Sequence, residues 1–261
     1  MEQKKRYELI DGIRGLAMVN MVIFHFLYDV FIIYGRDPGW YGRTGSHLWQ
    51  QGICWTFILV SGFSWRFGKK NSIRRGIFLN LCGLVITVVT GLAVPGQAAI
   101  FGILNFLGCA ILLMALLDRW ADRIPPAAGL VGSMLCFFLL RHINTGTLGI
   151  GALSVSIPRI GRYPSPLTAA LPTVLGFPDL AFSSSDYFSL LPWFFLFAAG
   201  YFLYQVADEI RTDPGDPFCQ DPPVVCLGKI QHLGVSGTSA AVHGDLYAFD
   251  GRVLTWGFGS Q

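Results

Sequence analysis

The stretch G-L-A-M-V-N-M-V-I-F-H-F-L-Y-D-V-F-I-I-Y (residues 15–34) decides the fold of this chain. Its residues are largely apolar, with Asn20, His25 and Asp29 as the main polar exceptions. A helix needs about 20 predominantly apolar residues to cross the hydrocarbon core of a bilayer. The stretch therefore predicts a transmembrane helix, and similar stretches recur along the chain.

The composition extends this prediction to most of the molecule. Of the 261 residues, 52% are hydrophobic and 13% are charged, whereas soluble domains carry about 25% charged residues. Further apolar stretches predict spans near residues 49–66, 76–94, 98–117, 124–140 and 188–206. The predicted fold class is an all-α, polytopic transmembrane helix bundle of about six spans, with the lipid bilayer as its partner. A net charge of +3 is too small for a nucleic-acid-binding protein.

Basic residues gather in every second loop and predict the orientation of the spans. These loops contain Lys4, Lys5, Arg6, Arg14, Arg66, Lys69, Lys70, Arg74, Arg75, Arg119 and Arg123. Because positive charge marks the cytoplasmic side, we expect the N-terminus to be cytoplasmic. The loop at 141–187 is then outside, where it is expected to pack over the bundle. The expected location is the cell (cytoplasmic) membrane, with the chain as a multi-pass protein.

Two ionisable side chains lie inside the first predicted span. His25 falls near the middle of residues 15–34, and Asp29 follows it by four residues, on the same helix face. Ionisable groups at membrane depth are costly and are candidates for function. An Asp one turn away can orient a His as a general base, so we predict His25 and Asp29 to be catalytic. The alternative is a buried hydrogen-bonded pair that only holds helices together.

Other polar residues are candidates for substrate or cofactor contacts. Asp11 and Arg14 continue the face of His25 toward the cytoplasm, Asn105 lies in a span, and Asp186 lies at the outer mouth of the last one. Asp186 could hold an amine or hydroxyl of a substrate, or serve only as an interfacial anchor. A basic loop could receive the phosphates of a cytoplasmic cofactor, or could only determine topology; it contains Arg66, Lys69, Lys70, Arg74 and Arg75. No metal site is expected, because the spans hold no cluster of His and Cys.

Several motifs, in order along about residues 1–206, resemble one membrane family. They are R-Y-E-L-I-D-G-I-R-G-L-A-M-V-N-M-V-I-F-H-F-L-Y-D (6–29), F-I-L-V-S-G-F-S (57–64), I-R-R-G (73–76), F-G-I-L-N (101–105) and S-D-Y-F-S-L-L-P-W-F-F-L-F-A-A-G-Y (185–201). Together they resemble the heparan-α-glucosaminide N-acetyltransferase catalytic-domain-like proteins, which are relatives of the broader membrane acyltransferases.

The resemblance implies a reaction and a set of roles. Such enzymes move an acetyl group from cytoplasmic acetyl-CoA across the membrane to a sugar amine or hydroxyl, so a sugar or glycan acceptor is the expected partner. His25 and Arg14 match an important His and the Arg before it in related acyltransferases. The characterised lysosomal enzyme uses a His in the following loop, which makes His47 the second choice for the base. Family members usually have His where this chain has Asn105, so an acid or base role there is not expected.

The last part of the chain departs from this pattern. Residues 1–210 are predicted to form the transmembrane acyltransferase-like domain, and residues 211–261 form a polar, Gly-rich tail without a span. We expect the tail to be a truncated or frame-shifted end, in which case the copy would be inactive. The rival functions are a transporter or exporter that uses His25 and Asp29 as a proton relay, and a non-catalytic scaffold. A homo-oligomer is possible in each case.

Overall fold

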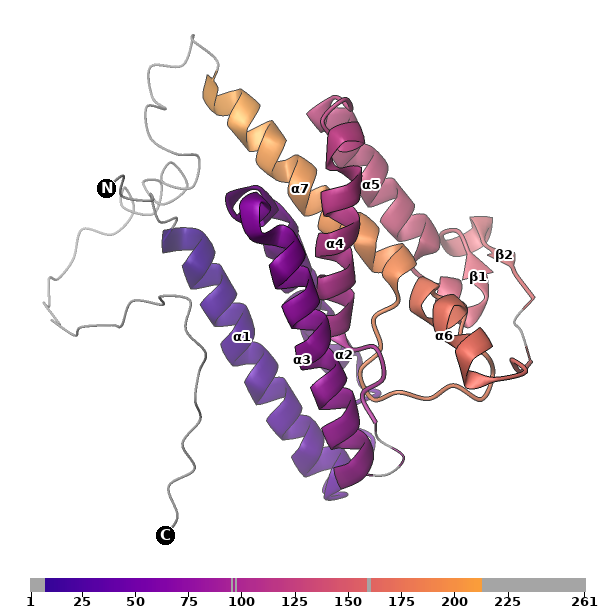
Figure 1. Cartoon of the computed structure of the whole chain (residues 1–261). Helices are drawn as coiled ribbons and strands as arrows, with labels where there is room; N and C mark the ends of the chain where they lie inside the picture. Colours follow the sequence, from indigo (N-terminus) through magenta and orange to yellow (C-terminus); the bar gives the residue numbers. More distant parts are fainter. Residues whose placement is uncertain (1–7, 95, 97, 159–160, 213–261) are drawn as a thin grey trace, which may run out of the picture.

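The computed structural model describes residues 8–94, 96, 98–158 and 161–212, and these form a bundle of long helices with a small side unit (Figure 1). The helices are α1 (Glu8–Tyr28), η1 (Asp29–Ile33, a π-helix), α2 (Thr44–Phe63), η2 (Trp65–Asn71), α3 (Ser72–Ala93), α4 (Ile103–Ala121), α5 (Pro126–Leu140), η3 (Ile143–Thr145), η4 (Gly151–Leu153), α6 (Pro166–Leu175) and α7 (Leu190–Thr212). The predicted tail at 211–261 lies almost wholly outside the described residues.

Each predicted span has a helix in its place, and the all-α bundle is confirmed. Within the described residues, five segments are long and apolar enough to cross a membrane: Leu9–Ile32, Trp65–Ala93, Ile103–Ala121, Pro126–Thr145 and Leu190–Ile210. The helix at the second predicted span, α2, is not among these five segments. Its first half contains Ser46, Gln50 and Gln51, which lower its hydropathy. The chain is an integral membrane protein.

Close backbone contacts hold the central helices together. A Cβ added at Gly62 on α2 would overlap the backbone carbonyl of Phe197 on α7, and one at Gly200 would overlap that of Leu59. Small residues let membrane helices approach in this way. On α4, the amide of Asn105 donates to the carbonyl of Asn80 on α3 at 3.3 Å. These contacts explain why Gly and Asn occur inside spans.

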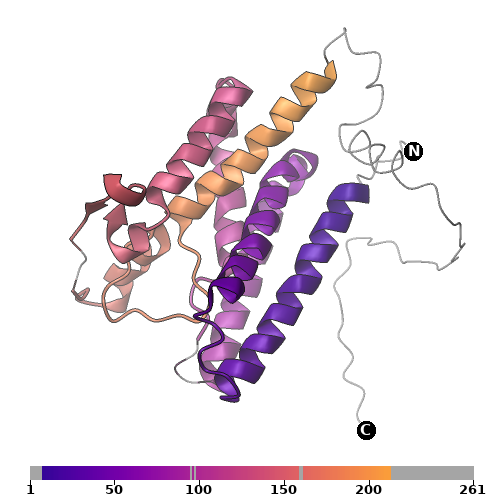
Figure 2. The same cartoon turned by 180° about the vertical axis from the view of Figure 1, so that it is seen from behind.

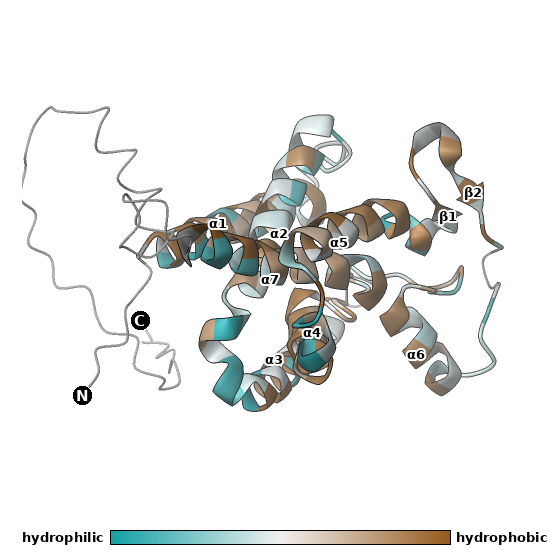
Figure 3. Ribbon diagram, turned by 90° about the horizontal axis from the view of Figure 1, so that it is seen from above, coloured by the Kyte–Doolittle hydropathy of each residue, from teal (hydrophilic) through white to brown (hydrophobic). Residues whose placement is uncertain are grey.

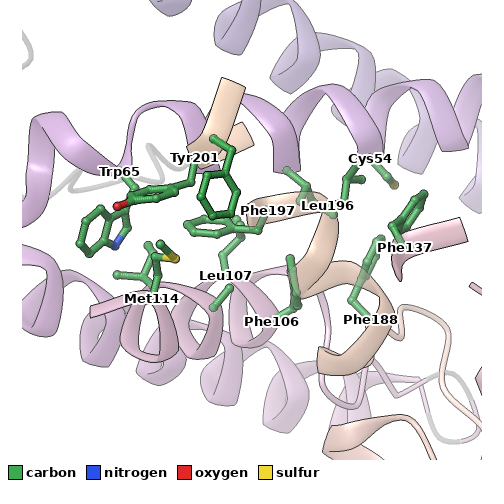
Figure 4. Close-up of a cluster of buried hydrophobic side chains, with 14 of the residues drawn as sticks. Cys54, Trp65, Phe106, Leu107, Met114, Phe137, Phe188, Leu196, Phe197 and Tyr201 are labelled. Carbon is green, nitrogen blue, oxygen red and sulfur yellow. The ribbon is translucent and has the colours of Figure 1, made fainter. Parts of the chain in front are cut away.

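The apolar core lies where α2, α4, α5 and α7 meet (Figure 4). Phe106, Phe137, Phe197 and Tyr201 are fully buried there. In contrast, α1 packs mainly on α2, and α3 packs mainly on α4. Figure 2 shows α1 at the edge of the bundle, away from this core. The outer surfaces of α1 and α3 carry many exposed apolar side chains, as expected for surfaces that face lipid.

The segment between α5 and α7 forms the side unit. Its strands β1 (Thr147–Leu148) and β2 (Val155–Ser156) pair antiparallel, and Ser165 caps α6 in a reciprocal capping box with Thr168. The unit lies beside the ends of α5 and α7 (Figure 1). Gly149 N–H donates to Leu139 of α5. The last residues of the unit cross back to the bundle, where Ser185 N–H donates to Ala98 and Phe188 N–H donates to Phe101. These bonds place residues 184–188 against the start of α4.

Polar groups gather at the end of the bundle where α1 begins. Figure 3 looks onto this end and shows hydrophilic ribbon on α1, beside α3 and on α4. The basic loop around η2 meets the last turn of α4 there, because Arg66 pairs with Asp122 and Lys69 with Asp118. We refer to it as the inner end, which the sequence predicts to be cytoplasmic, and to the opposite one as the outer end.

Candidate functional site

A cavity of about 710 Å³ lies between α1, α2, α3, α4 and the segment before α7. Most of its wall is apolar, from residues such as Met18, Phe57 and Ile86. Its polar wall residues include His25, Tyr28, Asp29, Tyr41, Gln50, Thr90, Asn105 and Asp186. The cavity therefore brings together four residues that the sequence singled out: His25 on α1, Asp29 on η1, Asn105 on α4 and Asp186 before α7.

One face of α1 forms a continuous stripe along the cavity. Met18, His25 and Asp29 all line it, at intervals that keep them on one side of a helix. Arg14 lies on the same face toward the inner end and pairs with Asp11 at 3.5 Å. The outer part of the predicted stripe therefore lines the cavity, but His25 and Asp29 are exposed, as is Asp11 at the inner end.

His25 lies nearer the outer end than the sequence suggested. It occupies the last turn of α1, and at Asp29 the backbone changes to the π-helix η1. The prediction placed His25 near the middle of a span at 15–34, but the α-helix begins earlier, at Glu8, and ends at Tyr28. Short π-helical segments occur frequently at functional sites. The outer position puts His25 level with the start of α4 and with the segment that precedes α7.

Asp186 is fixed at the N-terminus of α4. Its Oδ2 accepts a hydrogen bond from Ile103 N–H at 3.2 Å, and a helix N-terminus favours a negative charge. Burial raises the pKa of this carboxyl above its ordinary value, while the Ile103 N–H and the charge of His25 each lower that pKa in part. His25 and Asp186 therefore line one cavity, and the charge of His25 acts on the Asp186 carboxyl.

Asp29 and Asp186 are the two carboxyl groups that line the cavity with His25. Among the described residues, no hydrogen bond or ion pair joins His25 to either carboxyl group. The α-helix ends between His25 and Asp29, so the side-chain geometry of two successive α-helical turns is not maintained there. The charge of His25 lowers the pKa of Asp186 in part. The role of Asp29 as the residue that orients His25 stays a prediction, and Asp186 is a second candidate for that role.

The backbone that holds Asp186 carries strain. Phe101 has a φ of 56°, a left-handed conformation that is unusual for a residue with a side chain and costs about 1–2 kcal/mol. Two bonds hold it in place: Phe188 N–H donates to its carbonyl, and Ser184 Oγ accepts from Ile100 N–H at 2.8 Å. Strained backbone often accumulates at functional sites, and here it turns the chain so that Gly102 can begin α4 beside Asp186.

The basic residues of the inner end are not equivalent. Arg66 and Lys69 are paired with Asp122 and Asp118, and the hydroxyl of Tyr201 donates to Asp122 at 2.8 Å. These two cations are therefore already neutralised by carboxylates. Lys70, Arg74 and Arg75 are exposed, and the charge of Arg75 acts on that of Arg14 across the inner ends of α1 and α3.

His47, the second choice for the base, lies outside the cavity, and two residues that were not predicted lie in its wall. His47 is exposed in the first turn of α2 and does not line the cavity. Gln50 and Tyr41 do line it, and Gln50 Nε2 donates to the Tyr41 hydroxyl at 3.1 Å. The sequence offered a signal for Gln50, because polar residues in the first half of an otherwise apolar helix need a polar surface to face. Within the described ranges, no group of three or more His, Cys, Asp or Glu could hold a metal ion.

The fold and the cavity define a polytopic membrane protein whose polar side chains meet between helices at the outer end. The family described as heparan-alpha-glucosaminide N-acetyltransferase, catalytic, matches residues 6–229. The chain belongs to this family of membrane acetyltransferase-like proteins, which confirms the resemblance drawn from the motifs. No curated protein and no solved structure matches the chain.

The raised pKa of Asp186 predicts a pH-dependent stability. The folded protein holds a proton on this carboxyl more tightly than the unfolded chain does. The contribution of Asp186 to the free energy of unfolding is therefore largest below the ordinary carboxyl pKa, and it is lost as the pH rises through the raised pKa. An Asp186→Asn variant does not titrate, so it does not lose stability in this way, and its amide oxygen can still accept the hydrogen bond from Ile103 N–H. Thermal unfolding in detergent should therefore show that the variant gains on the wild type as the pH increases. A pH-independent difference between the two proteins would contradict the assignment.

Proposed function

We propose that this protein transfers an acetyl group from cytoplasmic acetyl-CoA to an amine or hydroxyl of a sugar or glycan acceptor at the outer end of the bundle. The observation that carries the proposal is the cavity in which His25 from α1, Asn105 from α4 and Asp186 from the outer segment meet. Family membership supports the reaction class. The proposed location is the cell (cytoplasmic) membrane.

His25 is the proposed general base. The attacking amine or hydroxyl of the acceptor gives its proton to the imidazole as a bond forms from its nitrogen or oxygen to the thioester carbonyl carbon. The bond from that carbon to sulfur then breaks, and the departing thiolate takes the proton from the imidazolium. The Asp186 carboxylate favours the imidazolium that exists between these two transfers, as the charge of His25 favours the carboxylate.

The donor is proposed to approach from the inner end. Arg14 and Arg75 repel one another across the ends of α1 and α3, so a phosphate group between them would relieve this repulsion. Arg66 and Lys69 are less suitable, because Asp122 and Asp118 already neutralise them. At 1.5 Å per residue, His25 lies about 16 Å farther along α1 than Arg14. An extended pantetheine arm is of comparable length, so phosphates at Arg14 would allow a thioester near His25.

Asn105 is proposed to orient the acceptor or the thioester by hydrogen bonding. Its amide reaches the Asn80 carbonyl and it also lines the cavity. An amide neither gives nor takes a proton under these conditions, so this position serves binding alone. Asp29 and Tyr28, which line the same wall, are proposed acceptor contacts.

The test is acetyl transfer by purified protein in liposomes, with labelled acetyl-CoA as donor and a glucosaminide as acceptor. Label on the acceptor supports the proposal, and its absence at any acceptor concentration contradicts it. Proton-coupled flux of the sugar without transfer would instead favour the transporter. A protein that shows neither acetyl transfer nor sugar flux would agree with the inactive copy that the sequence of residues 211–261 led us to expect.

A Gly102→Ala substitution should impair transfer while leaving the fold nearly unchanged. A Cβ at this position would lie 2.6 Å from Asp186 Oδ2, so the carboxylate must move. The backbone φ of −73° suits Ala, and the atom that must move is the end of a side chain, so stability changes little. A displacement of about 1 Å can cost up to about 100-fold in rate, and we expect a loss of at least about 10-fold.

Gly91→Ala is the matched control for Gly102→Ala. Gly91 lies near the end of α3, and a Cβ there would meet only Ala98 at an ordinary 3.8 Å. Its transfer rate should equal that of the wild type. Equal rates for Gly102→Ala and Gly91→Ala would contradict a role for the position of Asp186.

A further inference from the structure

The cavity has a side wall formed by two helices that do not pack closely on one another. The main partner of α1 is α2, and the main partner of α3 is α4. Both helices nevertheless line the same cavity, α1 through Met18, Met21 and His25, and α3 through Gly83, Ile86 and Thr90. The wall between α1 and α3 is therefore built from side chains that approach from two separate helix pairs.

This wall is open toward the surroundings of the bundle. Met18 is 55% exposed and Ile86 is 43% exposed, although both line the cavity. A side chain can meet both conditions only at an opening, which we call the lateral opening and define by Met18 and Ile86. Neighbouring outward side chains on the same helices, Val22 at 65% and Val85 at 61%, are exposed without lining the cavity.

The lateral opening lies at the depth of the hydrocarbon. Met18 belongs to the apolar segment Leu9–Ile32, and Ile86 belongs to Trp65–Ala93. Both residues are well inside their segments and not at the ends. What borders the opening in a membrane is therefore lipid chains and not water. The polar residues His25, Asn105 and Asp186 line the same cavity, so a polar site is continuous with an apolar side entrance.

A water-soluble sugar has no interaction to make with such an entrance, since its hydroxyls lose their hydrogen bonds in an apolar slot. A sugar carried on a hydrocarbon chain matches both parts, with the head at the polar residues and the chain along Met18 and Ile86. We propose that the acceptor is lipid-carried, a sugar amine or hydroxyl on a hydrocarbon anchor that enters from the bilayer through the lateral opening. This inference rests on the proposed acetyl transfer and specifies its acceptor class.

The experiment compares two acceptors that have the same head. Dodecyl glucosaminide and methyl glucosaminide are offered to the protein in liposomes with labelled acetyl-CoA. The wild type should acetylate the dodecyl compound with a kcat/KM at least about 10-fold higher, compared at equal concentration in the membrane phase, because its anchor holds the sugar in position at the lateral opening. Comparable values for the two glucosaminides would overturn the inference while leaving acetyl transfer in place.

Substitutions at the opening provide the second arm. Met18→Trp and Ile86→Trp narrow the lateral opening and should lower transfer to the dodecyl compound by about 10-fold, with a smaller effect on the methyl compound. Val22→Trp and Val85→Trp place the same side chain on the same two helices, away from the cavity, and should leave both rates unchanged. They also report on any general effect of Trp on folding.

The outcomes separate the two proposals. Unchanged transfer to the dodecyl compound in Met18→Trp and Ile86→Trp would overturn lateral entry. Absence of transfer to either glucosaminide by the wild type would overturn the proposed function, and the inference with it. Loss in the variants at Met18 and Ile86 alone, confined to the dodecyl compound, would establish the lateral opening as the acceptor path.

Discussion

Replacing His25 by Gln should lower acetyl transfer by about 10²- to 10⁴-fold, the contribution of a positioned general base. Gln keeps a polar side chain in the cavity but cannot take the proton of the acceptor. The measurement is kcat/KM for transfer from acetyl-CoA in liposomes. We expect the loss to appear in kcat, because proton transfer belongs to the transition state and not to acceptor binding.

His47→Gln is the matched control for His25. The sequence offered His25 and His47 as the two candidates for the base. His47 is exposed in the first turn of α2 and lies outside the cavity. Its transfer rate should remain within about two-fold of the wild type, as for a surface residue far from the site. A large loss in His47→Gln with little change in His25→Gln would move the base to the start of α2.

Replacing Gly62 by Ala should destabilise the bundle more than any other single-methyl addition discussed above. The added Cβ would overlap the backbone carbonyl of Phe197 on α7, and a backbone atom cannot move without separating two helices. Overpacking of this kind costs about 1–3 kcal/mol and occasionally more, and we expect the upper part of that range. The measurement is the thermal unfolding midpoint of the purified protein in detergent.

Gly52→Ala on the same helix supplies the control for Gly62→Ala. No atom lies within 4 Å of the Cβ that would be added at Gly52. The helix propensity of Ala then predicts a gain of about 0.5–1 kcal/mol. A lower midpoint for Gly52→Ala than for Gly62→Ala would show that the close crossing of α2 and α7 is not what holds these helices together.

The helices were predictable because a bilayer imposes a simple pattern. Each span must bury about 20 residues of backbone polar groups inside one apolar helix, and this leaves a signal in the local sequence. The same criterion also explains where the prediction was incomplete. The first half of α2 carries Gln50 and Gln51, which lower its hydropathy, and Gln50 is polar because it lines the cavity.

The site was harder to predict because its members meet across the bundle. His25 and Asp29 were conspicuous as two ionisable groups in one span, but helix spacing alone could not show that the α-helix ends at Tyr28. Asp186 was recognised as a candidate for the acceptor. Its place in the same cavity as His25 depends on the backbone bonds that hold residues 184–188 beside the start of α4, and no local pattern encodes such an arrangement.

The basic loop shows a related difficulty. Charge counts suggested five equivalent cations at 66–75, but the structure pairs Arg66 and Lys69 with Asp122 and Asp118. The signal was present, since Asp118 and Asp122 are one helical turn apart at the inner end of a span, and Asp118, which is buried, requires a partner. The pairing narrows the donor side to Arg14 and the exposed Lys70, Arg74 and Arg75.

A double-mutant cycle on His25 and Asp186 tests the central claim most directly, namely that these two side chains form one catalytic unit across the bundle. Acetyl transfer is measured for the wild type, His25→Gln, Asp186→Asn and the double variant under identical conditions. If Asp186 acts through His25, the double variant should be about as slow as His25→Gln alone, because groups that act as a unit are strongly non-additive. Losses that multiply in the double variant would contradict the account, since they would show that the two residues act independently.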